Sequence, residues 1–124
     1  MRSLGVLAWR IPASGMYESR RKMSLPDVIA FCKGEFLGFQ VKASSKRYVR
    51  VYRRQLEPLD VWLSDVLEHG VPARAFVAVK FVGGWWKIQE FDGLRHYDFD
   101  IKGATRLRGQ LELVLGLQTR LEVR

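Results

Sequence analysis

The sequence predicts an α/β fold with an α+β arrangement, in which a central mixed β-sheet is flanked by helices. Two pairs of short apolar segments are joined by tight turns, at Lys33-Gly34 and Gly83-Gly84, which is typical of β-hairpins. Two other segments carry leucine and valine residues at helical spacing. With 124 residues, 48% of them hydrophobic, the chain has enough material for one core, so we expect a single domain over residues 1–124.

The first hairpin is the element around which the others are arranged. Its first strand, Val28–Phe31, is continuously apolar, whereas Phe36–Lys42 alternates between two faces. In chain order we expect a strand at 4–11, a mobile basic loop at 12–24, the hairpin at 28–42, a helix at 55–69, a hairpin at 73–91, a short strand at 95–101 and a helix at 107–120.

The positive charge lies in the first half of the chain. Residues 1–54 carry twelve Lys or Arg and three Asp or Glu, a balance of +9, whereas residues 55–124 carry nine and ten, a balance of −1. A basic region of this kind indicates a polyanionic partner, most simply nucleic acid. The alternative interpretation is a generally basic protein from a hot or salty cytoplasm.

Other features of composition exclude several classes of protein. The single cysteine, Cys32, excludes an internal disulfide framework and a cysteine-based zinc site. No apolar run approaches the ~20 residues of a membrane span, and the N-terminus lacks the pattern of a secretory signal. We therefore expect a cytoplasmic protein with no membrane partner and no small-molecule cofactor.

A candidate catalytic cluster lies in the first hairpin. Asp27 precedes its first strand, and Gln40 and Lys42 share one face of its second strand. Antiparallel pairing across the Lys33-Gly34 turn brings Asp27 near Gln40 and Lys42. A carboxylate beside a lysine at the end of a sheet can hold a divalent metal and orient a water on a phosphate. The alternative for Lys42 is a solvated lysine at a strand end.

Cationic side chains with interleaved tyrosines surround this hairpin. They suit contact with DNA phosphates, although Tyr48 and Tyr52 can equally pack on the following helix. The predicted DNA-binding cations are Arg20, Arg21, Lys22, Lys46, Arg47, Arg50, Arg53 and Arg54.

The chain resembles the archaeal Holliday junction resolvases, which belong to the PD-(D/E)xK nuclease superfamily. The matching segments occur in the same order over most of the sequence. They are Trp9–Gly15 (WRIPASG), Pro26–Ala30 (PDVIA), Gln40–Lys42 (QVK), Ala78–Phe81 with Gly84–Lys87 (AVKF and GWWK), and Leu111–Gln118 (LELVLGLQ).

The resemblance implies a restriction-endonuclease-like fold and a structure-selective endonuclease of recombination and repair. In that family a homodimer binds four-way DNA junctions on a flat basic face, and each subunit cuts one strand. The implied cofactor is Mg²⁺, with Mn²⁺ as a possible substitute.

The resemblance also implies roles for individual residues. Asp27 matches the metal-binding aspartate, Gln40 stands where the family more often has glutamate, and Lys42 matches the catalytic lysine. Arg10 and Lys80 are implied to be further basic residues of the catalytic site, with solvated strand lysines or arginines as the alternative. Ser14 is implied to contact DNA, and Trp62 matches a helix aromatic at the dimer interface, with a buried anchor as the alternative.

Two departures from the family pattern leave alternatives open. The family has an N-terminal helix with a glutamate that completes the metal site, and Met1–Gly5 resembles only its last turn. Gln40 supplies a neutral amide instead of a carboxylate, which weakens a magnesium site. The natural start can lie upstream, Glu18 can replace the missing ligand, or the protein can bind junctions without cutting them. A nuclease acting on duplex DNA and a small RNA-binding module are more distant alternatives.

Overall fold

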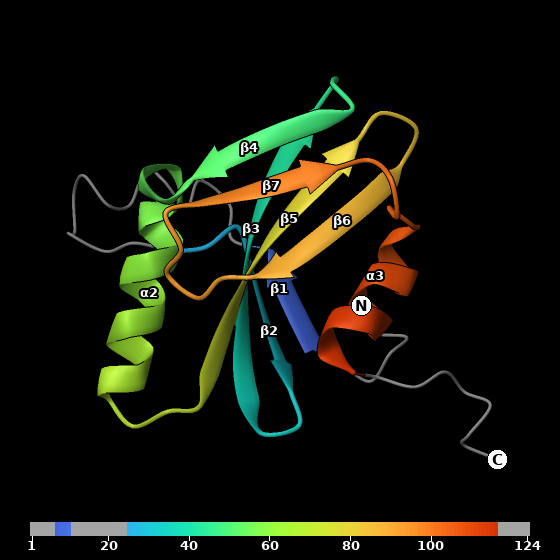
Figure 1. The fold of residues 1–124 in the computed structure, drawn as a ribbon. Coiled ribbons are helices and arrows are strands. Elements are labelled where there is room, and N and C mark those ends of the chain that lie inside the picture. Colours follow the sequence, from blue (N-terminus) through green and yellow to red (C-terminus); the bar gives the residue numbers. More distant parts are fainter. Residues whose placement is uncertain (1–6, 11–24, 117–124) are drawn as a thin grey trace, which may run out of the picture.

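The central element of the structure is a five-stranded mixed sheet (Figure 1). The computed structural model describes residues 7–10 and 25–116, and for residues 7–10 it describes the backbone only. β3 and β5 pair in parallel, and the other neighbouring strands pair antiparallel. The sheet order is β1-β2-β3-β5-β6, with β1 (Leu7–Arg10), β2 (Val28–Cys32), β3 (Glu35–Ser44), β5 (Ala73–Phe81) and β6 (Trp85–Glu90).

Both predicted hairpins are confirmed. β2 and β3 turn at Lys33 and Gly34, where both residues have positive φ. This backbone is typical of a tight two-residue hairpin turn, in which glycine is favoured. β5 and β6 turn through residues 82–84, as the Gly83-Gly84 pair predicts.

A second, two-stranded sheet covers one face of the central sheet. It consists of β4 (Tyr48–Tyr52) and β7 (His96–Asp100), paired antiparallel. The sequence predicts β7, but β4 is not among the predicted elements. A 3-10 turn, η2 (Arg53–Leu56), leads from β4 into α2 (Glu57–Glu68), which confirms the predicted helix with Pro58 in its first turn.

Each face of the central sheet has its own apolar core. On one face, Val77, Val79 and Phe81 of β5 pack with α2 and with the inward side chains of the second sheet. On the other face, Leu37 and Phe39 of β3 pack with α3 (Leu107–Leu115). Side chains alternate between the two faces along each strand, so the odd- and even-numbered residues of one strand join different cores.

The close approach of α2 to the sheet depends on Gly38. A Cβ atom at Gly38 would lie 2.5 Å from Cζ3 of Trp62. The indole therefore lies directly on the backbone of β3, and only 7% of Trp62 is exposed. Trp62 is therefore a buried anchor of α2, and its place at a dimer interface stays a prediction.

The predicted C-terminal helix is shorter than its pattern indicates. α3 ends at Leu115, and Gly116 follows with φ 67° in the left-handed region that often closes a helix. The expectation that the helix continues to residue 120 is wrong at this point, because a left-handed residue cannot continue an α-helix. Residues 117–124 lie outside the described part of the chain.

The outer edge of β6 is closed by the segment that precedes and begins α3. Trp86 and Thr105 exchange two backbone hydrogen bonds, of 2.7 and 3.0 Å. The amide of Ile88 then donates to Oε1 of the buried Gln110 at 2.8 Å. A glutamine side chain thus takes the place of a neighbouring strand.

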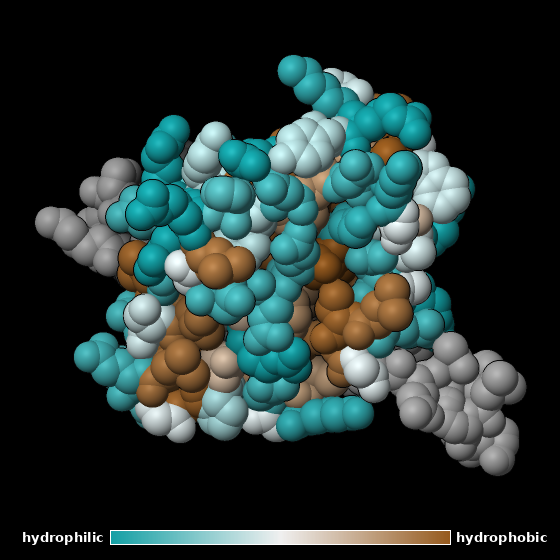
Figure 2. Space-filling view, viewed as in Figure 1, coloured by the Kyte–Doolittle hydropathy of each residue, from teal (hydrophilic) through white to brown (hydrophobic). Residues whose placement is uncertain are grey.

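The surface of the second sheet is hydrophilic. Figure 2 shows polar side chains over β4 and β7, and hydrophobic ones gathered over parts of α2 and α3. Among residues 7–10 and 25–116, no helix has the length and apolar character needed to cross a membrane.

Candidate active site

The carboxylate of Asp27 lies against β3, as predicted. The backbone amide of Asp27 donates to the carbonyl of Phe39 at 3.0 Å, which extends the β2–β3 pairing by one residue. Its Oδ2 atom accepts hydrogen bonds from Nε2 of Gln40 at 3.2 Å and from the amide of Val41 at 2.9 Å. The predicted proximity of Asp27 and Gln40 is therefore confirmed.

The other end of the Gln40 amide has no partner. Its Oε1 atom is buried and makes no hydrogen bond within the described residues. Leaving a buried acceptor unpaired costs about 1–3 kcal/mol, and such atoms are uncommon in folded proteins. A hard oxygen without a partner, next to a carboxylate, is suited to a cation or an ordered water.

Lys42 and Arg10 lie close to this pair by their backbone positions. Lys42 is half-buried and stands two residues after Gln40, so the two side chains leave β3 on the same face. Arg10 pairs with Val28, the residue after Asp27, in the β1–β2 register. The structure thus places Asp27, Gln40, Lys42 and the backbone of Arg10 at one end of the first hairpin.

The structure does not bring Lys80 into this cluster. In the parallel β3–β5 register, Lys42 is opposite Val79 and Lys80 is opposite Ala43. Val79 packs in the core under α2, so Lys80, one residue later, leaves the sheet on the face that carries α3. There its Nζ lies 5.9 Å from the centre of the Trp86 ring. The expectation that Lys80 joins the catalytic lysine fails because adjacent residues of a strand point to opposite faces.

Two of the predicted DNA-binding arginines are held by acidic residues. Nε of Arg50 on β4 donates to Asp98 on β7 at 2.7 Å, in a two-pronged pair. This hydrogen bond raises the pKa of Arg50, and the guanidinium lowers the pKa of the Asp98 carboxyl. Arg53 binds Asp60 at 3.1 Å and the carbonyl of Gly93. Their charges are therefore partly neutralised within the protein.

The remaining predicted cations of this segment have no acidic partner among the described residues. Lys46 and Arg47 are exposed in the turn between β3 and β4, and the Arg54 guanidinium lies 5.0 Å from the centre of the Tyr52 ring. Sequence reasoning missed Asp98 as the partner of Arg50. The sequence carries one signal for this pair: polar and apolar residues alternate in both 48–52 and 96–100. Pairing these segments as antiparallel strands places Arg50 and Asp98 side by side on the outer face.

Other predicted site residues lie outside the described part of the chain. These are Ser14, Arg20, Arg21 and Lys22. The described residues also contain no group of three or more His, Cys, Asp or Glu side chains that could hold a metal. Within those limits the candidate metal ligands are Asp27 and Gln40.

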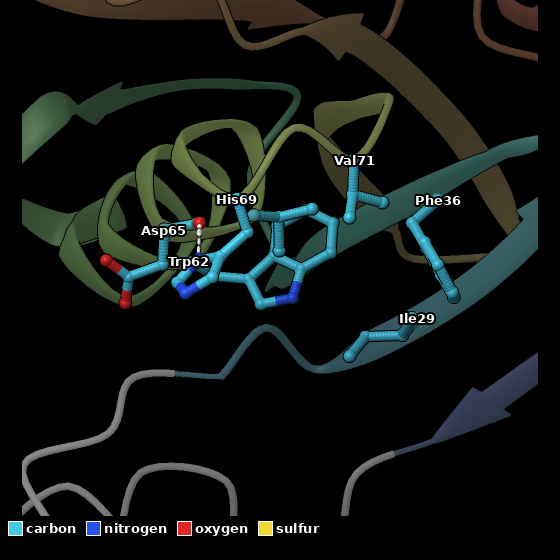
Figure 3. Close-up of a pocket in the computed structure, with 7 residues that line it drawn as sticks. Ile29, Phe36, Trp62, Asp65, His69 and Val71 are labelled. Carbon is cyan, nitrogen blue, oxygen red and sulfur yellow. Dashed lines mark hydrogen bonds between the residues drawn. The ribbon is translucent and has the colours of Figure 1, made fainter.

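A mainly apolar pocket of about 340 Å³ lies beside the buried ring of Trp62 (Figure 3). Ile29 and Phe36 of the first hairpin form one wall, and Asp65 and His69 of the α2 end lie opposite them. Nδ1 of His69 lies 2.8 Å from the carbonyl oxygen of Asp65, which fixes the imidazole at the rim. Trp62 thus lines a surface pocket while its ring is packed on β3.

Comparisons with known proteins agree with this architecture. The chain matches the structure of Hjc from Archaeoglobus fulgidus, described as a Holliday junction resolvase from an archaeal hyperthermophile, with a TM-score of 0.60 and 17% sequence identity. The match covers 96% of this chain and 88% of that one, and it shows a shared fold. No curated protein sequence matches the chain. The profile described as archaeal Holliday junction resolvase (Hjc) matches residues 1–120. The chain therefore belongs to the archaeal Holliday junction resolvase (Hjc) family.

Proposed function

We propose that this protein binds four-way DNA junctions and cleaves them by metal-dependent hydrolysis of phosphodiester bonds. Membership of the resolvase family supports the substrate and the reaction. The observation that carries the metal dependence is the buried, unpaired Oε1 of Gln40 next to the carboxylate of Asp27. The basic first half of the chain supports a polyanionic substrate.

The residues at the end of the first hairpin fit a magnesium ion. Asp27 supplies a carboxylate and Gln40 an amide oxygen, both of which are the hard oxygen donors that Mg²⁺ prefers. When bound, the metal supplies Lewis-acid activation of the phosphate. Mn²⁺ accepts the same donors and is the expected substitute.

Each residue of the cluster has a defined task in this reaction. Asp27 is held in place by the Val41 amide and the Gln40 side chain, so its position does not depend on the substrate. Lys42 either takes a proton from the attacking water as a neutral amine, or, as an ammonium, orients that water and offsets the negative charge that develops on the phosphate. Lys42 is half-buried, and a charge that is partly shielded from water acts more strongly on a nearby phosphate.

A second candidate function is junction binding without cleavage. It is favoured by one observation: within residues 7–10 and 25–116, no group of three or more His, Cys, Asp or Glu side chains that could hold a metal includes Asp27. Each missing negative charge weakens the binding of a divalent cation. A further carboxylate has to come from residues outside this range, such as Glu18, if the site is to resemble a full magnesium site.

Cleavage and binding can be measured separately. A synthetic four-way junction is incubated with the protein in Mg²⁺, and junction affinity is measured in parallel in a chelator. Paired nicks that appear only with Mg²⁺ support the nuclease, with linear duplex of the same sequences as the competitor. Tight junction binding with no nicks in either Mg²⁺ or Mn²⁺ would show the binding protein instead.

Replacement of Lys42 by Ala tests the chemistry of the cluster directly. We expect cleavage at saturating junction to fall by at least about 100-fold, since Lys42 acts on the water and the transition state. Junction affinity in chelator should change by less than about twofold. Lys33→Ala, which removes an exposed lysine at the opposite end of the hairpin, is the control. A parallel loss of affinity in Lys42→Ala would assign this lysine to phosphate contact alone.

The proposed assembly is a homodimer in the cytoplasm. Resolution of a four-way junction requires two cuts, and two copies of the chain supply two active sites. The pocket beside Trp62 is our candidate for a surface near the subunit contact, as the family resemblance implies for this residue.

A further inference from the structure

Lys80 requires a different explanation from the catalytic one, because it leaves the sheet on the opposite face from Gln40 and Lys42. It is exposed, and no acidic side chain among the described residues pairs with it. Its surroundings at the carboxyl ends of β3 and β5 indicate what it can bind.

A hollow of about 390 Å³ lies at these strand ends, between the β3–β4 turn and the β5–β6 turn. Its lining includes Lys80, Ser45, Val82 and Gly83, and it contains no acidic residue. This is many times the ~30 Å³ that a water molecule occupies in the liquid. The hollow can therefore admit a tetrahedral anion with its ester groups.

The walls of the hollow are fixed before any ligand arrives. In the β3–β4 turn, Oγ of Ser44 accepts from the Lys46 amide at 3.0 Å and donates to the Lys46 carbonyl at 3.1 Å. In the β5–β6 turn, Nη1 of Arg106 donates to the carbonyls of Gly83 and Gly84, and its guanidinium lies 4.1 Å from the centre of the Trp85 ring. Fixed walls lower the entropy lost when a ligand is bound.

We infer that this hollow binds a backbone phosphate of the DNA, with Lys80 as the cation and Ser45 as a hydroxyl donor. The inference rests on the proposed function and adds a second point of contact to it. Lys42 and Lys80 lie one step apart in the β3–β5 register but on opposite faces. A DNA strand that passes around the carboxyl ends of β3 and β5 meets both lysines. The scissile phosphate then lies at Lys42 and a neighbouring phosphate lies at Lys80. Lys80 is then a phosphate-binding residue that adds to the affinity for the junction and takes no part in the cleavage step.

The test compares Lys80→Met with Lys33→Met in the full chain. Both variants remove one exposed ammonium and keep most of the stem, and Lys33 lies at the opposite end of the central sheet. Junction affinity is measured in chelator over a range of salt concentrations, so this part does not depend on cleavage. Single-turnover cleavage in Mg²⁺ is measured at saturating junction.

For Lys80→Met we expect affinity to fall about three- to tenfold and the slope of log K against log salt to fall by about one. Cleavage at saturating junction should stay within about twofold of the parent protein. Lys33→Met should change neither quantity. A junction with single methylphosphonate substitutions should identify one phosphate whose neutralisation weakens the parent protein but not Lys80→Met.

Three results would overturn the inference. If Lys80→Met loses cleavage at saturating junction while its junction affinity is unchanged, Lys80 takes part in the cleavage step. Equal effects of Lys80→Met and Lys33→Met would show a general charge effect. Inorganic phosphate can also be tested as a competitor of the junction at constant ionic strength. If it competes in the parent protein but not in Lys80→Met, and the two proteins bind the junction equally well, the hollow is a site for free anions. A protein that binds junctions but never cuts them would contradict the proposed nuclease and leave the affinity measurements for Lys80 decisive.

Discussion

Gln40 links the two requirements of the site, because one end of its amide fixes Asp27 and the other end offers an unpaired oxygen. The N–H group donates to Oδ2 of Asp27 at 3.2 Å, while Oε1 is buried without a partner in the described chain. An amide can do both at once, whereas a glutamate at this position would repel Asp27 until a cation arrived. We therefore expect Gln40 to stabilise the site without metal and to weaken its affinity for the proposed metal.

Gln40→Glu should reverse this balance. In chelator we expect the free energy of unfolding to fall by about 1–3 kcal/mol, because Asp27 loses a hydrogen bond and gains a like charge. The repulsion requires both carboxyl groups to carry a charge. Added Mg²⁺ or Mn²⁺ should restore stability more in the variant than in the parent.

Thermal unfolding in chelator and in millimolar Mg²⁺ is the measurement. Gln55→Glu is the matched control, because Oε1 of Gln55 accepts from the Tyr52 amide and a carboxylate can do the same. If Mg²⁺ raises the unfolding temperature equally in Gln40→Glu and Gln55→Glu, Gln40 does not take part in metal binding.

At the scale of elements, β3 joins the site to both cores. Its even-numbered residues, such as Gly38 and Gln40, face α2, and its odd-numbered residues, such as Phe39, face α3. The contact of Trp62 with Gly38 sets the distance between α2 and the strand that carries Gln40 and Lys42. The packing of α2 therefore influences the position of the site.

Gly38→Ala tests this contact. The new methyl group would lie 2.5 Å from Cζ3 of Trp62, so the helix or the indole must move. We expect the free energy of unfolding in urea to fall by about 1–3 kcal/mol, as for other overpacked cores. Gly38→Ala combined with Trp62→Leu should lose less than the sum of the two single variants, because the smaller side chain leaves room. Strict additivity would show that Gly38 and Trp62 are not coupled.

In the proposed complex, the β4–β7 pair leaves fewer cations free for DNA, because Asp98 holds Arg50. Because Arg50 lowers the pKa of Asp98, their ion pair is present at neutral pH and is lost only as acid protonates Asp98 below its ordinary range. Asp98→Asn should free Arg50, strengthen junction binding about two- to fivefold and steepen the salt slope by about one. The measurement is junction affinity in chelator at several salt concentrations. Glu68→Gln, an equal charge change on α2, is the control, and an equal gain in both would show that β4 does not face DNA.

How much of the fold the sequence could predict depends on whether the pairing was local. The β2–β3 hairpin and the Asp27–Gln40 contact were predictable, because a two-residue turn at Lys33 fixes the register of the strands beside it. β4 was missed because its partner lies more than forty residues later and its exposed arginine suggested DNA contact. The face of Lys80 was not predictable either, since a shift of one residue in the parallel β3–β5 register would reverse it.

At the scale of the whole molecule, we assign cleavage and phosphate binding to opposite faces of the central sheet. One face carries Asp27, Gln40 and Lys42, and the other carries Lys80 in the hollow between two turns. The excess of positive charge in residues 1–54 reaches both, because the first hairpin and the β3–β4 turn belong to that half. We therefore expect the salt dependence of binding to come mainly from residues 1–54.

Joint replacement of Arg20, Arg21 and Lys22 by Gln tests this distribution. We expect weaker junction binding and a salt slope that falls by about two to three, because each phosphate contact releases about one counterion. The control replaces Lys33, Arg95 and Lys102, three exposed cations, by Gln. Affinity measured against salt for both variants decides the matter, and an unchanged slope for the first would mean that this basic run faces away from DNA.

The closed edge of β6 has a consequence for self-association. Thr105 and Gln110 occupy the hydrogen-bonding groups of Trp86 and Ile88, so a foreign strand cannot add there. Among the described strands, β1 stands at the other end of the sheet order. Two copies that paired through that opposite end would form a self-complementary contact that closes after two, because the blocked edge of β6 leaves no second edge for open-ended fibre growth.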